Sequence, residues 1–193
     1  MRERLREALS RRQTGPCLVA REGDQGPPMP AAVLLPIFHK GDGYHVLFTR
    51  RTQEVEHHKG QISFPGGARG PEDESLEDTA LRESWEEVGL EPGDVDVLGK
   101  LDDMVTITNF EVRPFVGLIP HPYPFQLCAA EVDSLIEVPL QFLLNLRNSR
   151  EETHPGDSTH VQYSFEYDGN VIWGATARML SQFLFVLRDF VLR

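Results

Sequence analysis

The 193-residue sequence has little cysteine, no long apolar run and fewer basic than acidic residues. Its two cysteines, Cys17 and Cys128, lie far apart without CxxC spacing, so neither a disulfide framework nor a thiolate zinc site is supported. The longest apolar runs, such as Phe183 to Leu187, are far below the roughly 18 residues that a bilayer span requires. The N-terminal residues lack the apolar segment of a secretory signal. We therefore expect a cytoplasmic protein without a membrane segment.

The charge balance is strongly acidic and uneven along the chain. Nineteen Lys and Arg residues stand against 30 Asp and Glu residues, for a net charge of -11. This balance argues against sequence-independent binding to nucleic acid, which needs cations that neutralise phosphates. Ten acidic residues and one basic residue, Arg82, lie between Glu72 and Asp94. A segment of this composition is either a solvated face or a cation site.

Hydrophobic periodicity and turn residues predict an α/β (α+β) protein with a mixed β-sheet. The Pro- and Gly-rich stretch from Arg21 to Pro30 is interpreted as a linker. It divides the chain into residues 1–30, an amphipathic N-terminal helix with its linker, and residues 31–193, the main domain. Strands are expected at 31–38, 44–49, 61–64, 96–101, 112–119, 135–138, 161–167 and 171–173. Helices are expected at 1–13, 75–88 and 139–146 and at the C-terminal end.

The helix at 75–88 carries the clearest local signals. Ser75 with Asp78 fits a capping box, and Gly89 stands where a left-handed C-terminal cap is expected. Trp85, on the apolar face of this helix, and Trp173 are both expected in the core.

Three carboxylates of this helix, Glu83, Glu86 and Glu87, share one stripe about 100° wide, pointing away from the apolar face. Like charges at this spacing cost helix stability. A hard divalent cation would remove that cost, because Mg²⁺ binds carboxylate oxygens together with substrate phosphates. The alternative is the solvated face of an ordinary surface helix.

Gly67, Glu74 and the run from Arg82 to Leu90 together resemble the Nudix box, the signature of the Nudix hydrolase superfamily. Two positions depart from it: six residues instead of five separate Gly67 from Glu74, and Ser84 stands where an aliphatic residue is usual. The resemblance implies an α/β/α sandwich. It also implies hydrolysis of a diphosphate linked to another moiety, with Mg²⁺ or Mn²⁺ required.

The segments 47–52 and 60–67 resemble the motif just upstream of the box in the coenzyme A pyrophosphatase branch, and residues 171–177 resemble the same branch. Glu56 departs from this motif, because an arginine is usual there. The resemblance implies cleavage of coenzyme A into 4′-phosphopantetheine and adenosine 3′,5′-bisphosphate. ADP-ribose or another nucleoside diphosphate derivative is the alternative substrate. A catalytically silent fold used as a binding module is a third hypothesis, and the three retained glutamates argue against it.

By motif position, the resemblance assigns the metal to Glu83, Glu86 and Glu87, and gives Arg82 the role of orienting a glutamate. Glu86 is the first choice for the general base, with Glu131 and Glu137 as rivals.

Substrate contacts are expected from residues just before the box. His57 and His58 could bind a 3′-phosphate, or form an exposed turn. Arg50 and Arg51 could serve likewise, although strand alternation lets only one of them face the site. Gly66 and Gly67 lack a Cβ and leave room beside the acidic helix. The oligomeric state and the role of the N-terminal helix, whether docked on the core or paired with another subunit, stay open.

Overall fold

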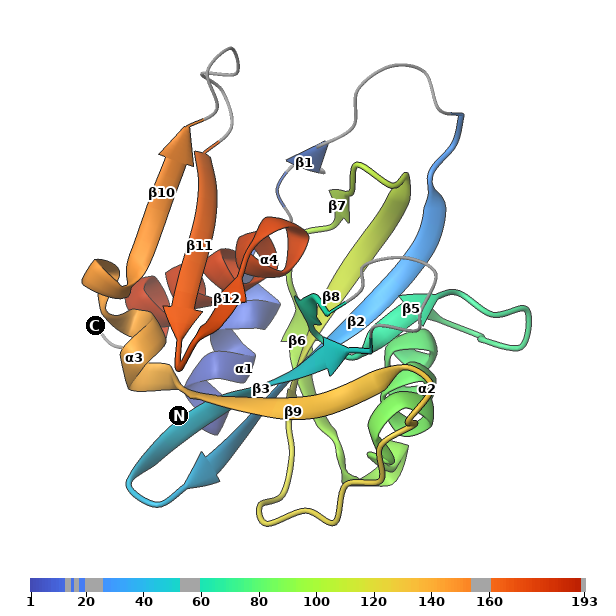
Figure 1. Ribbon diagram of the computed structural model, residues 1–193, viewed down its shortest axis with the longest axis horizontal. Helices are drawn as coiled ribbons and strands as arrows, with labels where there is room; N and C mark the ends of the chain where they lie inside the picture. Colours follow the sequence, from blue (N-terminus) through green and yellow to red (C-terminus); the bar gives the residue numbers. More distant parts are fainter. Residues whose placement is uncertain (13–14, 16–17, 20–25, 53–59, 154–160, 192–193) are drawn as a thin grey trace.

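The computed structural model describes residues 1–12, 15, 18–19, 26–52, 60–153 and 161–191 (Figure 1). Within them, nine strands form one sheet in the order β1-β7-β8-β2-β3-β4, with β5 beside β2, β6 beside β8 and β9 beside β3. The strands β2 and β8 are parallel, whereas β2 and β3 are antiparallel, so the predicted mixed sheet is confirmed. The strand bounds are β1 Leu18–Val19, β2 Met29–Lys40, β3 Gly43–Arg51, β4 Ile62–Ser63, β5 Gly66–Ala68, β6 Asp96–Lys100, β7 Met104–Val105, β8 Phe110–Leu118 and β9 Val132–Pro139.

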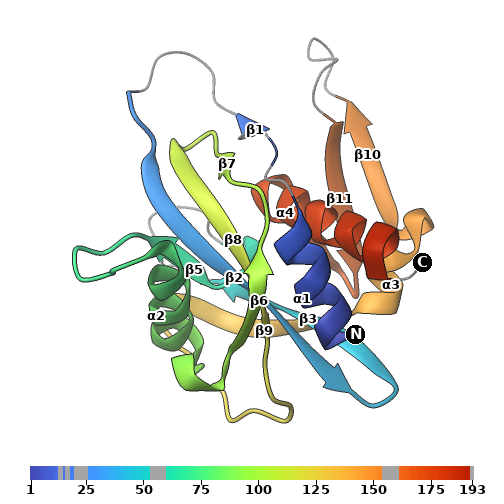
Figure 2. The same cartoon turned by 180° about the vertical axis from the view of Figure 1, so that it is seen from behind.

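Helices cover both faces of this sheet. Their bounds are α1 Arg2–Arg11, α2 Leu76–Val88, α3 Leu140–Leu144 and α4 Gly174–Val186. Short 3₁₀ turns lie at Pro92–Asp94 and Leu146–Asn148, and a π turn at Leu187–Val191. A second sheet, β10 Ser149–Thr153, β11 Val161–Tyr167 and β12 Asn170–Ile172, packs against α4. Figure 2 shows α1 and α4 together on one side of the main sheet, away from α2, which gives the expected α/β/α sandwich.

The alternation of side chains along β2 separates two apolar cores. Ala32 and Leu34 pack with Val88 of α2, whereas Leu35 and Ile37 pack on the other face in the core that includes α4. Because β2 is the central strand and is buried on both faces, it reads as a continuous apolar run.

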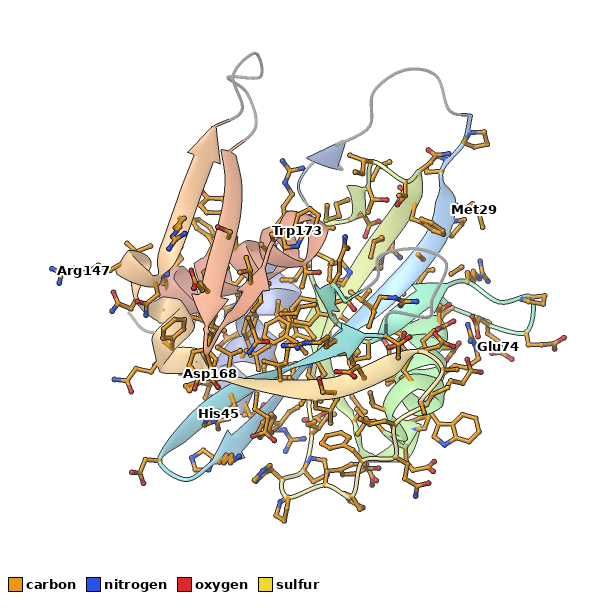
Figure 3. The ribbon with its side chains drawn as sticks, viewed as in Figure 1. Met29, His45, Glu74, Arg147, Asp168 and Trp173 are labelled. Carbon is orange, nitrogen blue, oxygen red and sulfur yellow. The ribbon has the colours of Figure 1, made fainter. Side chains whose placement is uncertain are left out.

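The longer predicted elements are confirmed, but four short strands were not predicted. β1, β5 and β7 have two or three residues and carry no alternating pattern, while β10 is polar. These strands form because a neighbouring strand offers hydrogen-bond partners. The prediction that both tryptophans lie in the core was wrong: Trp85 is 49% exposed and Trp173 50% exposed. Trp173 lies at the start of α4 (Figure 3), and the Trp85 indole donates to Glu91.

The N-terminal helix α1 docks on the main domain. Leu5, Ala8 and Leu9 are buried in the core shared with α4. Arg2 and Arg6 both pair with Asp96 of β6, which fixes the start of the helix on the sheet. The division of the chain at residue 30 stays a prediction, because residues 20–25 of the expected linker lie outside the described residues. Among the described residues, no helix has the length and apolar character needed to cross a membrane.

We expect Leu5→Ala to lower the free energy of unfolding by about 2–5 kcal/mol, because it leaves a cavity in a packed core. The matched control is Leu146→Ala, since Leu146 is 67% exposed and its truncation is expected to change stability by less than about 0.5 kcal/mol. Urea denaturation followed by circular dichroism measures both. Equal midpoints for the two variants would show that α1 contributes nothing to the core.

Candidate metal centre and active site

Local interactions fix the register of α2 and therefore the angular positions of its glutamates. The Ser75 hydroxyl accepts from the Asp78 amide at 3.1 Å, and the Asp78 carboxylate accepts from the Ser75 amide at 2.8 Å. At the other end, Gly89 adopts a left-handed conformation with φ of 70°. The predicted capping box and C-terminal cap are both confirmed.

The three carboxylates of the predicted stripe differ sharply in exposure. The side chain of Glu86 is 47% exposed, that of Glu83 18% and that of Glu87 only 4%. The expectation that the whole stripe points away from the core was therefore wrong. Glu83 and Glu87 lie on the side of α2 that packs against β5, and the Glu87 Oε2 atom is buried with no hydrogen-bond partner among the described residues.

Burial changes the electrostatics of this pair of glutamates. Desolvation raises the pKa of Glu87 to about 8, the charges of Glu131 and Glu83 add to the rise, and Arg51 opposes it. Burial also raises the pKa of Glu83, with Arg82 opposing the rise. Negative charge confined in this way costs free energy unless a cation is close. The site therefore favours binding of a positive ion.

Two glycines permit β5 to lie close to its neighbours, Gly66 to β2 and Gly67 to the acidic helix. Gly66 has φ of 151°, and a Cβ there would lie 2.3 Å from the carbonyl oxygen of Ala32. A Cβ on Gly67 would lie 2.5 Å from a carboxylate oxygen of Glu83. A larger residue at Gly67 would push β5 away from the Glu83 carboxylate, as expected from the sequence, whereas a larger residue at Gly66 would push β5 away from β2.

Arg82 connects the helix carboxylates to the loop before α2. Its Nη1 lies 2.9 Å from Glu83 Oε1 and 2.8 Å from Glu86 Oε2. On its other side, Nε and Nη2 donate to the two oxygens of Asp73 at 2.9 and 3.0 Å. Nη2 also donates to the carbonyl oxygen of Ala68 at 3.2 Å. Arg82 thus lies where the proposed role of orienting a glutamate requires.

Asp73 is a residue of the site that was not predicted from the sequence. This residue is 7% exposed and also accepts from the Gly70 amide at 2.7 Å and the Thr79 hydroxyl at 2.9 Å. The Arg82 guanidinium holds the pKa of Asp73 well below its usual range. The next residue, Glu74, is exposed and lies in the loop from β5 to α2 at the edge of the molecule (Figure 3).

Asp73 explains the unusual loop spacing. Five residues separate Gly67 from Asp73, which is the usual spacing from the glycine to the first acid of the box. Glu74, in contrast, keeps the usual spacing to Arg82. Because of the extra residue, the spacing from the glycine and the spacing to the arginine are met by two adjacent acids, Asp73 and Glu74. Counting forward from Gly67 was the signal that could have found Asp73.

The other departure from the box, Ser84, leaves the helix register unchanged. Ser84 is fully buried, and its hydroxyl donates to the carbonyl oxygen of Ala80 at 2.7 Å. A buried hydroxyl costs little when it is hydrogen-bonded in this way.

The rival general bases lie in different places. The segment before β9 is tied to the end of α2, since the Cys128 amide donates to the Glu87 carbonyl oxygen at 2.9 Å. This contact brings Glu131 close enough to raise the pKa of both Glu83 and Glu87. Glu137 pairs with Lys40 and is not among the charges acting on either glutamate. The geometry therefore favours Glu131 over Glu137.

The two arginines of β3 point to opposite faces of the sheet, as alternation predicts. Arg50 donates to Asn170 of β12, whereas Arg51 lies 3.7 Å from Glu87. Of the two, only Arg51 reaches the acidic helix. His57, His58 and Glu56 lie outside the described residues.

The residues present fit a divalent metal ion, although no three His, Cys, Asp or Glu side chains among the described residues already converge on one point. The donor set of Glu83, Glu86 and Glu87 is all oxygen, which suits Mg²⁺ or Mn²⁺. The buried Oε2 of Glu87 supplies a ligand atom that has no hydrogen-bond partner in the described parts of the chain.

An acidic helix held against a glycine turn inside an α/β/α sandwich is the arrangement that the resemblance to the Nudix hydrolases predicted. Residues 27–118 match the NUDIX domain family. The chain is 40% identical over 151 residues to the uncharacterized Nudix hydrolase NudL of Yersinia enterocolitica, covering 78% of this chain and 77% of that protein. NudL of Yersinia pestis is also 40% identical, over 78% of this chain and 75% of its own length. The chain belongs to the Nudix hydrolase family, whose members generally use divalent ions such as Mg²⁺ or Mn²⁺.

Solved structures show the same fold. The Ap4A hydrolase of C. elegans, in a binary complex, superposes with a TM-score of 0.50 at 16% identity, over 57% of this chain and 80% of its own. A NUDIX hydrolase from Alicyclobacillus acidocaldarius gives a TM-score of 0.50 at 21% identity, over 62% of this chain and 82% of its own.

Proposed function

We propose that this Nudix hydrolase is a cytoplasmic coenzyme A pyrophosphatase. One observation carries the proposal. The segments that resemble the coenzyme A branch form the end of β3, β4 and β5, and they bring Arg51, Gly66 and Gly67 against the carboxylates of α2. The motif associated with this substrate thus lies next to the proposed metal centre.

In the proposed reaction, water adds to one phosphorus of the pyrophosphate and the bridging phosphorus–oxygen bond breaks, giving 4′-phosphopantetheine and adenosine 3′,5′-bisphosphate. Glu83, Glu86 and Glu87 would hold the Mg²⁺ or Mn²⁺. Bound metal lowers the pKa of water and neutralises charge on phosphoryl oxygens. Arg82 orients Glu83 and Glu86 through its two short ion pairs.

The general base takes one proton from the attacking water. Glu86 is the proposed base because its half-exposed carboxylate is accessible to solvent, and Glu131 is the alternative. Arg51 is proposed to contact a phosphate oxygen of the substrate. His57 and His58 are proposed to contact the 3′-phosphate that distinguishes coenzyme A from ADP-ribose.

A chromatographic assay tests the substrate, comparing coenzyme A with ADP-ribose at millimolar Mg²⁺ and without metal. We expect coenzyme A to yield adenosine 3′,5′-bisphosphate only when metal is present. Faster cleavage of ADP-ribose would retain the enzyme class and contradict the coenzyme A assignment, because the box residues bind metal and not the leaving groups. No cleavage of either compound would favour a binding module.

A further inference from the structure

Arg51, the last residue of β3, and Glu87, near the end of α2, form an ion pair in which neither side chain is fully satisfied. Arg51 Nη1 lies 3.7 Å from Glu87 Oε1, which is longer than a hydrogen bond. Among the described residues, the buried Glu87 Oε2 and the buried Arg51 Nε both lack a hydrogen-bond partner. The pair is therefore held by charge and not by fitted hydrogen bonds.

The charges around Glu87 explain why the guanidinium of Arg51 lies beside it. Glu83 and Glu131 both place negative charge close to it, whereas the Arg51 side chain and, to a smaller extent, a hydrogen bond from the Gly66 backbone oppose their effect. A buried carboxylate without a counter-ion is costly. Arg82 cannot fill this need, because its ion pairs go to Asp73, Glu83 and Glu86.

The two arginines of the site are anchored very differently. Arg82 is fixed by both oxygens of Asp73 and by the carbonyl oxygen of Ala68. Within the part of the chain that the structure describes, the Arg51 side chain has Glu87 as its ion-pair partner, without a hydrogen bond, and 26% of its surface is exposed. Arg82 is thus held in place by hydrogen bonds, whereas Arg51, which is paired with Glu87 by charge alone among the described residues, can exchange its partner.

We propose that Arg51 is an exchangeable counter-ion of the metal centre. Without a bound metal its guanidinium lies beside the Glu87 carboxyl, and a divalent cation that binds Glu87 takes its place. The released guanidinium then binds a phosphate oxygen of the substrate, for which its fork of N–H donors is suited. This inference rests on the metal centre proposed above, and it holds for any diphosphate substrate.

If Arg51 and the metal compete for Glu87, removing the charge of Arg51 should raise the affinity of the protein for the metal. We expect Arg51→Gln to bind Mn²⁺ about tenfold more tightly than wild type, because the competing cation is gone. Arg50→Gln is the matched control: it removes the same charge from the same strand, but on the opposite face. Arg51→Lys keeps the charge and is expected to stay closer to wild type.

Electron paramagnetic resonance of free Mn²⁺ gives these affinities on the full chain at fixed pH and ionic strength, and thermal unfolding gives a second readout. The metal-induced rise in Tm should be larger for Arg51→Gln than for Arg50→Gln. If wild type binds Mn²⁺ and Arg51→Gln binds it equally well or more weakly, the proposed displacement of Arg51 by the metal is overturned. The assignment of the metal centre would stand in that case. If Arg51→Gln does not fold, weaker binding by Arg51→Lys overturns the displacement. Absence of Mn²⁺ binding by wild type overturns the metal centre and the exchange together.

The second step of the proposal, binding of Arg51 to the substrate, is tested by measuring KM. We expect Arg51→Gln to raise KM for the cleaved diphosphate roughly 10- to 100-fold at saturating metal, the loss of one charged hydrogen bond. An unchanged KM overturns this second half of the exchange. A merely structural arginine would lower stability and leave both the metal affinity and KM unchanged.

Discussion

Glu87→Gln is expected to reduce kcat by about three orders of magnitude while the protein remains folded. A catalytic metal contributes several kcal/mol to the stabilisation of transition-state charge. Each 1.36 kcal/mol corresponds to a factor of about ten in rate. Glutamine keeps the shape of the side chain but is a poor ligand for a divalent cation, so most of this contribution is lost.

The same substitution should not destabilise the metal-free protein. Glu87 is 3% exposed and has one oxygen without a partner among the described residues, so its charge is costly to bury. A neutral glutamine removes that cost, and the midpoint of urea denaturation without metal should stay the same or rise. Steady-state kinetics and denaturation on one preparation measure both effects.

The control for Glu87→Gln is Glu77→Gln, on the exposed face of the first turn of the same helix. It removes the same charge and is expected to keep close to wild-type kcat. A wild-type rate from Glu87→Gln would overturn the assignment of this residue to the metal. An equal loss in both variants would indicate a general effect of helix charge.

The parts of the site that were predictable from the sequence depend on neighbours three or four residues apart. Ser75 and Asp78 cap α2, and Gly89 ends it, through contacts inside one turn. Such contacts are encoded locally, so the register of Glu83, Glu86 and Glu87 followed from the sequence. The alternation of Arg50 and Arg51 followed in the same way from the period of a strand.

What could not be predicted depends on which element packs against which face. A helical wheel shows that Glu83 and Glu87 share a stripe, but it does not show that β5 covers that stripe. If β5 did not approach α2 as closely as Gly67 permits, the general rule would place the charged residues of α2 in solvent and Trp85 in the core. The structure reverses both assignments, since Glu87 is buried and Trp85 is half exposed. The proposed substrate likewise comes from the resemblance to the coenzyme A pyrophosphatase branch, because no local sequence pattern determines it.

Asp73→Asn and Glu74→Gln together form the second decisive comparison, because the two acids are adjacent in sequence and differ completely in environment. Asp73→Asn should lower kcat/KM about 10- to 100-fold, the usual effect of losing a residue that orients a metal ligand. It should also lower the free energy of unfolding by about 3 kcal/mol, since it leaves the Arg82 guanidinium without its buried partner. Glu74→Gln, on an exposed side chain, should change neither quantity measurably.

The pH dependence of stability separates the loss of this ion pair from a packing defect. Arg82 lowers the pKa of Asp73 in the folded protein below its ordinary value of 3.8. The unfolded chain therefore binds the Asp73 proton more tightly, so the stabilisation is present above that ordinary value and is lost as the pH falls. Urea denaturation at several pH values should show the gap between wild type and Asp73→Asn narrowing from about pH 5 to about pH 3. A gap that stays constant would indicate packing instead of charge. Loss of kcat/KM in Glu74→Gln but not in Asp73→Asn would assign the positioning of Arg82 to Glu74 and contradict the role of Asp73.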